Sequence, residues 1–217
     1  MWNSQVIIML LEGIRDTLYM TLASTLFGYI IGLPMGIVLT VTDKDGIRPN
    51  AAVYKVLDVI SNLLRSIPFI ILLIVLIPFT RFVVGRSYGS TAVPLTIAAA
   101  PYIARMVESS LKEVDAGVIE AARSMGASDF QIVTKVMLVE ARTSLIVGAT
   151  ISLGTILGYS AMAGTVGGGG LGDIAIRYGY TRWQTDIMVV TVVLLVILFQ
   201  IFQTIGMKIA NRLDRRK

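Results

Sequence analysis

The stretch that decides the fold is Thr17–Thr42, TLYMTLASTLFGYIIGLPMGIVLTVT, which contains 26 consecutive residues without a charge. An apolar run of about 18 residues or more is long enough to cross a bilayer as a helix. Two uncharged runs of 21 residues, Thr143–Ala163 and Ile187–Met207, pass the same test. Val53–Phe79 and Thr91–Leu111 pass it with a few charged residues. We therefore predict an all-α integral membrane protein with five transmembrane helices.

The composition supports a membrane protein and excludes several kinds of chemistry. Of the 217 residues, 55% are hydrophobic and only 15% are charged, and the mean hydropathy is +0.76. A soluble domain usually has about 25% charged residues. The chain has no Cys and no His, which removes thiolate metal sites and the commonest general base. We predict a single domain over residues 1–217, not an enzyme, with no catalytic residue, no metal site and no nucleic-acid partner.

The basic residues predict the orientation of the chain in the membrane. If the loop between the third and fourth helices is cytoplasmic, 13 Lys and Arg residues lie inside and five lie outside, with Arg65 left within a span. Cytoplasmic loops of membrane proteins carry such an excess of positive charge. We therefore expect the N-terminus outside and the C-terminus in the cytoplasm.

The first predicted helix carries three glycines at a spacing of four residues, Gly28, Gly32 and Gly36. Small residues at this spacing allow two membrane helices to approach until their backbones touch. A plain glycine-rich helix is the alternative, but we expect close packing against another helix, which can belong to the same chain.

The loop at 112–142 has the pattern of two short helices outside the membrane. Asp115 can cap the first helix and Gly126 can end it. The segment Ser128–Gln131 is a capping box that opens the second helix. We predict a helix-turn-helix with an exposed apolar ridge, whose members are Val118, Ile119, Ala121, Ala122, Met125, Phe130, Val133, Val136 and Met137.

This loop resembles a signature of known transporters. Glu120-Ala121-Ala122, three further residues and Gly126 match the EAA-x3-G motif of the permease subunits of ABC importers. The motif continues as x9-I-x-L-P, and here Val139 stands in place of the proline. The resemblance implies the type I ABC importer permease fold, in which this cytoplasmic loop forms coupling helices that dock on a separate ATPase. Glu120, Ala121, Ala122 and Gly126 would then be the ATPase-coupling residues. The alternative is an amphipathic helix that lies on lipid.

The second predicted span contains Arg65-Ser66-Ile67-Pro68, and proline within a helix removes a hydrogen bond. We expect a break near Ile67. Asp58 lies seven residues before Arg65, close to the same helix face, and could pair with it. Arg65 either anchors the helix near the cytoplasmic interface, which we favour, or contacts substrate.

The end of the fourth span is the predicted substrate pathway and gate. Tyr159, Ser160 and Met162 offer hydrogen bonds and an adaptable thioether surface. Gly167, Gly169 and Gly172 match GxGxxG in form, but the buried strand and the Lys-Ser/Thr of nucleotide sites are missing. We predict that this run is an external gate loop; a flexible linker and ordinary packing of Met162 are the alternatives.

Several further segments resemble the permease subunits of methionine importers. They are Arg65–Phe69, Pro78–Arg81, Val93–Thr96, Arg105–Glu108, Gly158–Met162 and Gly167–Gly172. The resemblance implies a homodimer in the bacterial plasma (inner) membrane, two cytoplasmic ABC ATPase subunits that bind ATP and Mg, and an extracytoplasmic substrate-binding lipoprotein. No cofactor is expected in this chain. The implied substrate is methionine, in its L and D forms.

Three other functions remain open from the sequence alone. An ABC permease for another amino acid or small solute would look similar. A self-contained, ion-coupled secondary transporter usually shows an internal repeat, and no convincing one is present. A membrane-embedded enzyme would need a carboxylate pair or a Ser-Lys arrangement, and none stands out.

Overall fold

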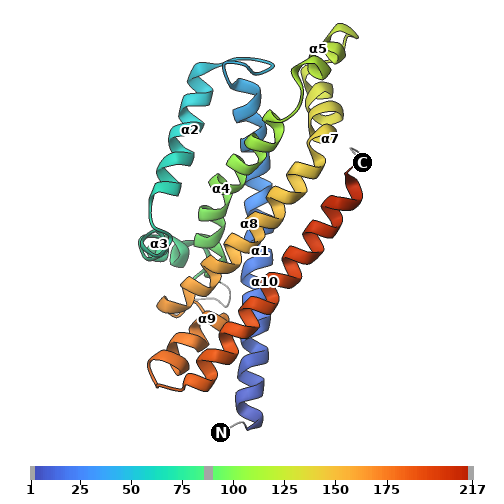
Figure 1. Cartoon of the computed structure of the whole chain (residues 1–217). Coiled ribbons are helices and arrows are strands. Elements are labelled where there is room, and N and C mark those ends of the chain that lie inside the picture. The colour runs from blue at the N-terminus through green and yellow to red at the C-terminus, as the bar shows by residue number, and fades with distance from the viewer. Residues whose placement is uncertain (1–2, 86–89, 215–217) are drawn as a thin grey trace.

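The protein is described from a computed structural model that covers residues 3–85 and 90–214 (Figure 1). Every regular element in these residues is helical. The α-helices are α1 (Ser4–Thr42), α2 (Ala51–Ser66), α3 (Phe69–Val84), α4 (Ala92–Lys112), α5 (Ala116–Ser124), α6 (Asp129–Gln131), α7 (Leu138–Glu140), α8 (Arg142–Ala163), α9 (Gly170–Ile174) and α10 (Thr185–Leu213). π-Helical segments at Ile132–Met137 and Ala175–Tyr180 and a 3₁₀ turn at Gly164–Val166 complete the set. Four basic residues of the charge count, Arg86, Arg215, Arg216 and Lys217, lie outside the described residues.

All five predicted spans occur as helices, but they differ in how well each could cross a bilayer alone. Within the described residues, three helical stretches are long and apolar enough, namely Ser4–Thr42, Arg142–Tyr180 and Thr185–Leu213. The bent pair α2 and α3 adds a fourth when taken together. α4 does not meet this criterion alone, because charged residues such as Arg105 and Glu108 lower its mean hydropathy. More than half of its residues are buried by neighbouring helices. A helix enclosed by protein does not need an apolar surface all round.

α1 is much longer than the predicted span, since it begins at Ser4 instead of Thr17. Its 39 residues measure roughly 58 Å at 1.5 Å per residue, about twice the hydrocarbon thickness of a bilayer. The extra turns project beyond the membrane and pack against α9 through an apolar cluster that includes Leu10, Leu171 and Ile174. The first segment therefore extends from one end of the molecule and helps to hold the chain that follows α8.

Close packing of the glycine face of the first helix is confirmed, and α4 of the same chain is the partner. A Cβ on Gly32 would lie 2.6 Å from the carbonyl oxygen of Ala100, and a Cβ on Gly36 would lie 2.5 Å from that of Ala104. Real Cβ atoms do not approach backbone oxygens so closely. Only glycine therefore allows these two backbones to touch.

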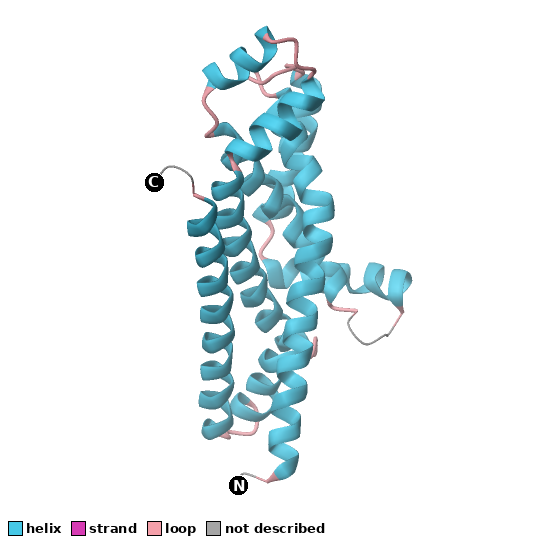
Figure 2. Cartoon of the chain, turned by 90° about the vertical axis from the view of Figure 1, so that its right-hand side faces the viewer, coloured by secondary structure: helices cyan, strands magenta, loops and turns pink. Residues whose placement is uncertain are grey.

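The predicted break near Ile67 is also confirmed, and it is large. The axes of α2 and α3 differ by 106°, with Ile67 extended and Pro68 at the N-cap of α3. α3 consequently projects from the side of the bundle, as Figure 2 shows. The segment expected as one span over 53–79 is thus two helices that meet almost at a right angle.

The two ends of the molecule are built from different parts of the chain (Figure 1). The short helices between α4 and α8 lie at the same end as the C-terminus, and the N-terminus lies at the opposite end with α9. This placement agrees with a chain that crosses the membrane an odd number of times.

α8 and α10 pack closely, since a Cβ on Gly206 of α10 would lie 2.0 Å from the hydroxyl oxygen of Thr150 on α8.

Candidate functional site: the hairpin, the charge cluster and the glycine corner

The loop at 112–142 folds as the predicted helix-turn-helix, which we call the hairpin. The side chain of Asp115 caps α5 by accepting a hydrogen bond from the backbone N–H of Gly117 at 2.8 Å. Gly126 follows α5 with a φ of +81°, the left-handed conformation that favours glycine. Ser128 and Gln131 form both hydrogen bonds of the capping box. The local signals in the sequence therefore set both turns of the hairpin.

The exposed apolar ridge is narrower than predicted. Met125 and Phe130 are 81% and 76% exposed and lie on either side of the turn. In contrast, Ala122 and Met137 are buried in a cluster with Ile132. These hairpin residues belong to the same buried cluster as Val107 and Leu111 of α4, so the core of the bundle continues into the hairpin and takes residues that were expected on the ridge.

The four predicted coupling residues are divided between these two surfaces. Glu120, Ala121 and Gly126 are exposed, so they are accessible to a partner. Ala122 is 5% exposed and packs inward, where its small side chain allows α5 to approach the second half of the hairpin. Of the two alanines, only Ala121 could therefore approach a groove on a partner.

The hairpin is rigidly connected to the rest of the chain. Its second half passes without a break through the π-helical segment Ile132–Met137 and α7 towards α8, and the N–H of Ala141 donates to the carbonyl of Met137 at 2.9 Å across the joint. The guanidinium of Arg123 donates to the carbonyl of Ile47 at 2.9 Å, in the loop that follows α1. A displacement of the hairpin is therefore passed on to α8 and to the end of α1.

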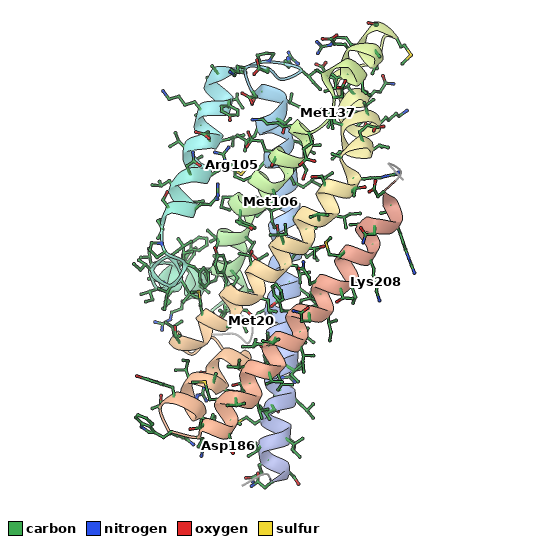
Figure 3. All side chains as sticks on the ribbon, in the orientation of Figure 1. Met20, Arg105, Met106, Met137, Asp186 and Lys208 are labelled. Atoms are coloured by element: carbon green, nitrogen blue, oxygen red, sulfur yellow. The ribbon has the colours of Figure 1, made fainter. Side chains whose placement is uncertain are left out.

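A cluster of charged side chains ties α1, α2 and α4 together beside the hairpin. Arg105 of α4 pairs with Asp58 of α2 and, at 2.7 Å, with Glu108 (Figure 3 shows Arg105 between the two helices). Lys112 binds Glu108 at 2.8 Å and Asp43, at the end of α1, at 2.6 Å. Glu108 is almost completely buried, and its two cations compensate the cost of burying a charge.

The expected pairing of Asp58 with Arg65 is wrong. Asp58 faces Arg105 instead, because α4 packs along the same side of α2. The spacing of Arg105, Glu108 and Lys112 by three and four residues is the signal in the sequence that could have indicated a shared helix face.

Acid should weaken this cluster through Asp43. The hydrogen bond from Lys112 holds the pKa of Asp43 below its ordinary value of 3.8. Because the folded carboxylate titrates lower than the unfolded one, its stabilising contribution is complete above about pH 4 and is lost as the pH falls further. A partly exposed pair contributes about 0.2–1 kcal/mol. Asp43→Asn should therefore lower Tm at pH 7 by about 2–4 °C or less. Thermal unfolding in detergent from pH 7 to pH 3 should show a smaller acid-dependent loss in the variant, and an identical loss would contradict the assignment.

The glycine run after α8 forms a tightly packed corner. A Cβ on Gly164 would lie 2.1 Å from the backbone nitrogen of Asp173, and a Cβ on Gly172 would lie 2.1 Å from the carbonyl oxygen of Ala161. Gly167 and Gly169 have φ values of +77° and +85°. We call this segment, residues 164–172, the glycine corner. Its glycines have steric roles that a plain linker would not require.

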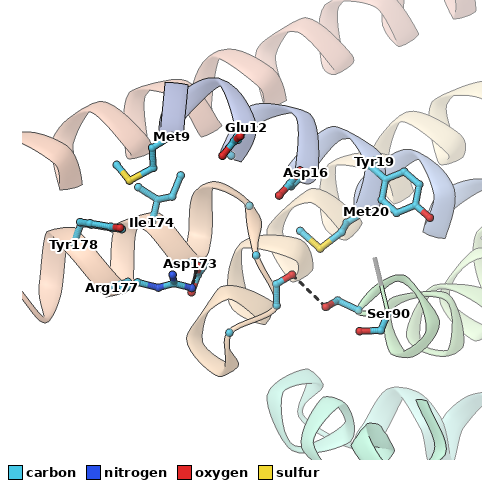
Figure 4. A pocket seen from close by; sticks show the side chains of 16 residues that line it. Met9, Glu12, Asp16, Tyr19, Met20, Ser90, Asp173, Ile174, Arg177 and Tyr178 are labelled. Atoms are coloured by element: carbon cyan, nitrogen blue, oxygen red, sulfur yellow. Dashed lines mark hydrogen bonds and ion pairs between the residues drawn. The ribbon is translucent and has the colours of Figure 1, made fainter. Parts of the chain in front are cut away.

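A cavity of about 460 Å³ lies beside α1 and the glycine corner, where the corner touches α1 through the hydrogen bond from the N–H of Leu171 to the hydroxyl of Thr17 at 2.9 Å. Glu12 and Asp16 lie on the α1 side, and Asp173 and Arg177 lie on the other (Figure 4). Arg177 pairs with Asp173 and Arg15 pairs with Asp16 at 3.1 Å, so two of these three carboxylates have a basic partner. Of the three predicted gate glycines, Gly167 and Gly169 line this cavity, whereas Gly172 packs against α8.

The three predicted pathway residues of α8 point in different directions. The ring of Tyr159 stacks on that of Phe69 in α3, with centroids 4.5 Å apart and an interplanar angle of 8°. Ser160 is buried, accepts a hydrogen bond from Thr21 of α1 at 3.4 Å and donates one to Leu157. Met162 is half exposed. The structure thus brings Tyr159 to α3, turns Ser160 to α1 and leaves Met162 on the surface.

Comparison with known protein families shows to which family this architecture belongs. Residues 19–217 match the family model of the binding-protein-dependent transport system inner membrane component. The chain belongs to this family. As a member of it, the protein is a multi-pass permease component of a transport system and has the type I ABC importer permease fold. The helices, the hairpin and the corner are parts of that fold.

Individual relatives of this inner membrane component are close in sequence. A probable D-methionine transport system permease protein, MetI, of Vibrio cholerae is 48% identical over 210 residues, which is 96% of this chain and 93% of the relative. The D-methionine transport system permease protein MetI of Escherichia coli K12 is 54% identical over 158 residues, or 72% of this chain and 73% of the relative.

Solved structures of family members show the same arrangement. A chain of the MetNI methionine ABC transporter in an inward-facing conformation superposes with a TM-score of 0.96 at 48% identity, over 99% of this chain and 100% of the other. A chain of an amino acid ABC transporter solved with histidines gives a TM-score of 0.79 at 18% identity, over 96% and 95% of the two chains, which shows a shared fold.

Proposed function

We propose that two copies of this chain form the membrane pathway of a methionine importer, which is driven by two cytoplasmic ATPase subunits. The observation that carries the proposal is the hairpin, whose exposed turn is fixed by caps and joined rigidly to α8. The 48% identity to a probable D-methionine permease over 96% of the chain supports methionine as the substrate.

The proposed mechanism is alternating access. Closure of the ATPases on ATP moves the two hairpins towards each other, and each hairpin carries α8 and the end of α1 with it. Because α8 ends at the glycine corner, the motion reaches the opposite face of the membrane and opens the pathway there. In this scheme Tyr159 and Met162 face the pathway, Ser160 attaches α8 to α1, and Gly167, Gly169 and Gly172 shape the outer gate. The partner ATPases bind ATP and Mg, and this chain needs no cofactor.

The proposed orientation follows from the hairpin. Since it must meet a cytoplasmic motor, the C-terminus is cytoplasmic and the N-terminal end of α1 lies outside, at the level of the glycine corner. An extracytoplasmic binding lipoprotein would deliver methionine to this outer face. The inner membrane of a bacterium is the site that the family description supports.

Reconstitution tests the proposal directly. The chain is purified with its ATPase, inserted into vesicles with the hairpin outside, and supplied with ATP outside and with binding protein and radiolabelled methionine inside. We expect ATP-dependent export from these inverted vesicles, competed by unlabelled D- and L-methionine. Transport that is unaffected by ATP and driven by a proton gradient would identify a secondary transporter. Competition by a different amino acid alone would identify another substrate.

A further inference from the structure

A second, smaller cavity lies at the break between α2 and α3, on a different part of the chain from the glycine corner. Its volume is about 180 Å³, and α2, α3, α4 and α8 all contribute to its wall. Pockets for drug-sized ligands measure roughly 300–1,000 Å³. This cavity therefore suits a small solute such as a single free amino acid.

The break gives the cavity two different walls. Arg65 lies in the last turn of α2 on one side, and Phe69 begins α3 on the other. In a continuous helix these two residues, four apart, would lie one above the other on the same face. The bend of 106° at Pro68 instead turns them to face a common space.

Arg65 supplies a cation that the fold does not use. Within residues 3–85 and 90–214 it makes no ion pair, and its expected partner Asp58 is bound to Arg105. Arg65 is exposed where it borders the cavity, and an Arg at membrane depth is costly unless it faces water or binds a counter-charge. A guanidinium binds a carboxylate through two parallel hydrogen bonds, which fits the free carboxylate of an amino acid.

The opposite wall is apolar and aromatic. Tyr159 and Phe69 present their stacked rings, and Leu72 and Ala98 are buried beside them. Such a surface accepts an aliphatic or thioether side chain, and the faces of aromatic rings also attract an ammonium group. The cavity therefore has one cationic and one apolar wall, the complement of an amino acid with an apolar side chain.

We infer that this cavity is a transient subsite for an apolar α-amino acid, in which Arg65 binds the carboxylate and the Phe69–Tyr159 pair receives the side chain. The inference rests on the proposed function and adds the part of the membrane path that holds the substrate. It also gives Tyr159 its role in the pathway.

The chain has no cysteine, so a single introduced thiol can report on the cavity. In Ala98→Cys, in the complete complex with its ATPase, the rate of maleimide labelling is measured with and without L-methionine. Methionine at about ten times its Kd should slow labelling by about tenfold, since the rate falls as 1 + [L]/Kd. L-Methioninol, which has an alcohol in place of the carboxylate, should protect much less. Arg65→Gln should abolish the protection by methionine, and Arg65→Lys should retain part of it.

Val56→Cys is the matched control, because this exposed position on α2 lies outside the cavity; methionine should not change its labelling. If Ala98→Cys does not assemble, Leu64→Cys reports on the same cavity. Unchanged labelling in a complex that transports methionine overturns the subsite and leaves the proposed function standing. Equal protection by methioninol, or protection that survives Arg65→Gln, overturns the assignment of Arg65. Absence of methionine transport by the wild-type complex overturns the proposed function itself.

Discussion

Phe130→Asp should abolish ATP-driven transport while the chain remains folded in the membrane. Phe130 is exposed at the turn of the hairpin, so its loss leaves the hairpin core of Ala122, Ile132 and Met137 intact. In the complex with an ATPase this ring would be buried, and aromatic anchors of this kind contribute about 2 kcal/mol or more to binding. Association should weaken by about 30-fold or more, at 1.4 kcal/mol per tenfold. The measurement is co-purification of the ATPase, together with transport.

Two further variants define the surface that the ATPase recognises. Glu120→Arg, on the exposed side of α5, should also reduce transport if the partner groove is basic. Trp183→Asp is the control, since it removes an exposed aromatic ring at the opposite end of the molecule and should leave co-purification unchanged. Normal transport by both Phe130→Asp and Glu120→Arg would refute the coupling role of the hairpin.

Gly172→Ala should strongly destabilise the glycine corner. The added Cβ would lie 2.1 Å from the carbonyl oxygen of Ala161, and neither atom belongs to a flexible side chain. Relief requires α9 to move away from α8, and overpacking of this kind costs about 1–3 kcal/mol or more. For a chain of this size we expect Tm to fall by about 5–10 °C. Thermal unfolding of the detergent-solubilised protein measures the change.

Gly158→Ala is the matched control for this prediction. Gly158 lies in α8 only a few residues before Ala161, and a Cβ there meets nothing within 4 Å. A glycine-to-alanine change at an open helical position stabilises by about 0.4–1 kcal/mol. The two variants should therefore shift Tm in opposite directions. Equal shifts would show that the corner is loose enough to accept a side chain.

Local features of the fold could be predicted because they depend on neighbouring residues only. Asp115 and Ser128 cap helices through hydrogen bonds to residues two or three positions away, and Gly126 ends α5 through its own conformation. Pro68 disfavours helical geometry at Ile67, although the prolines inside α1, α3 and α4 do not end those helices. Gly32, in its row of spaced glycines, indicates that the helix has a contact face, although the sequence alone does not predict that α4 packs against this face.

Features that depend on tertiary packing could not be predicted in the same way. The charged residues Glu12 and Asp16 interrupt the apolar run, so the run predicts a later start than α1 has. These two side chains are tolerated because they lie outside the hydrocarbon. The pairing of Asp58 depends on where α4 lies. Likewise, Ala122 faces inward because the buried cluster that includes Leu111 of α4 continues into the hairpin, which helical periodicity does not reveal.

The backbone contact between α1 and α4 has a consequence for motion. Where Gly32 and Gly36 touch α4, α1 contributes no side chain, and the α4 side chains at the contact, Ile103 and Val107, are β-branched and stiff, so little at this seam can rearrange. The two helices behave as one stiff beam. Conformational work applied through the hairpin is therefore absorbed elsewhere, at joints lined by side chains, and the 106° bend between α2 and α3 is one such joint.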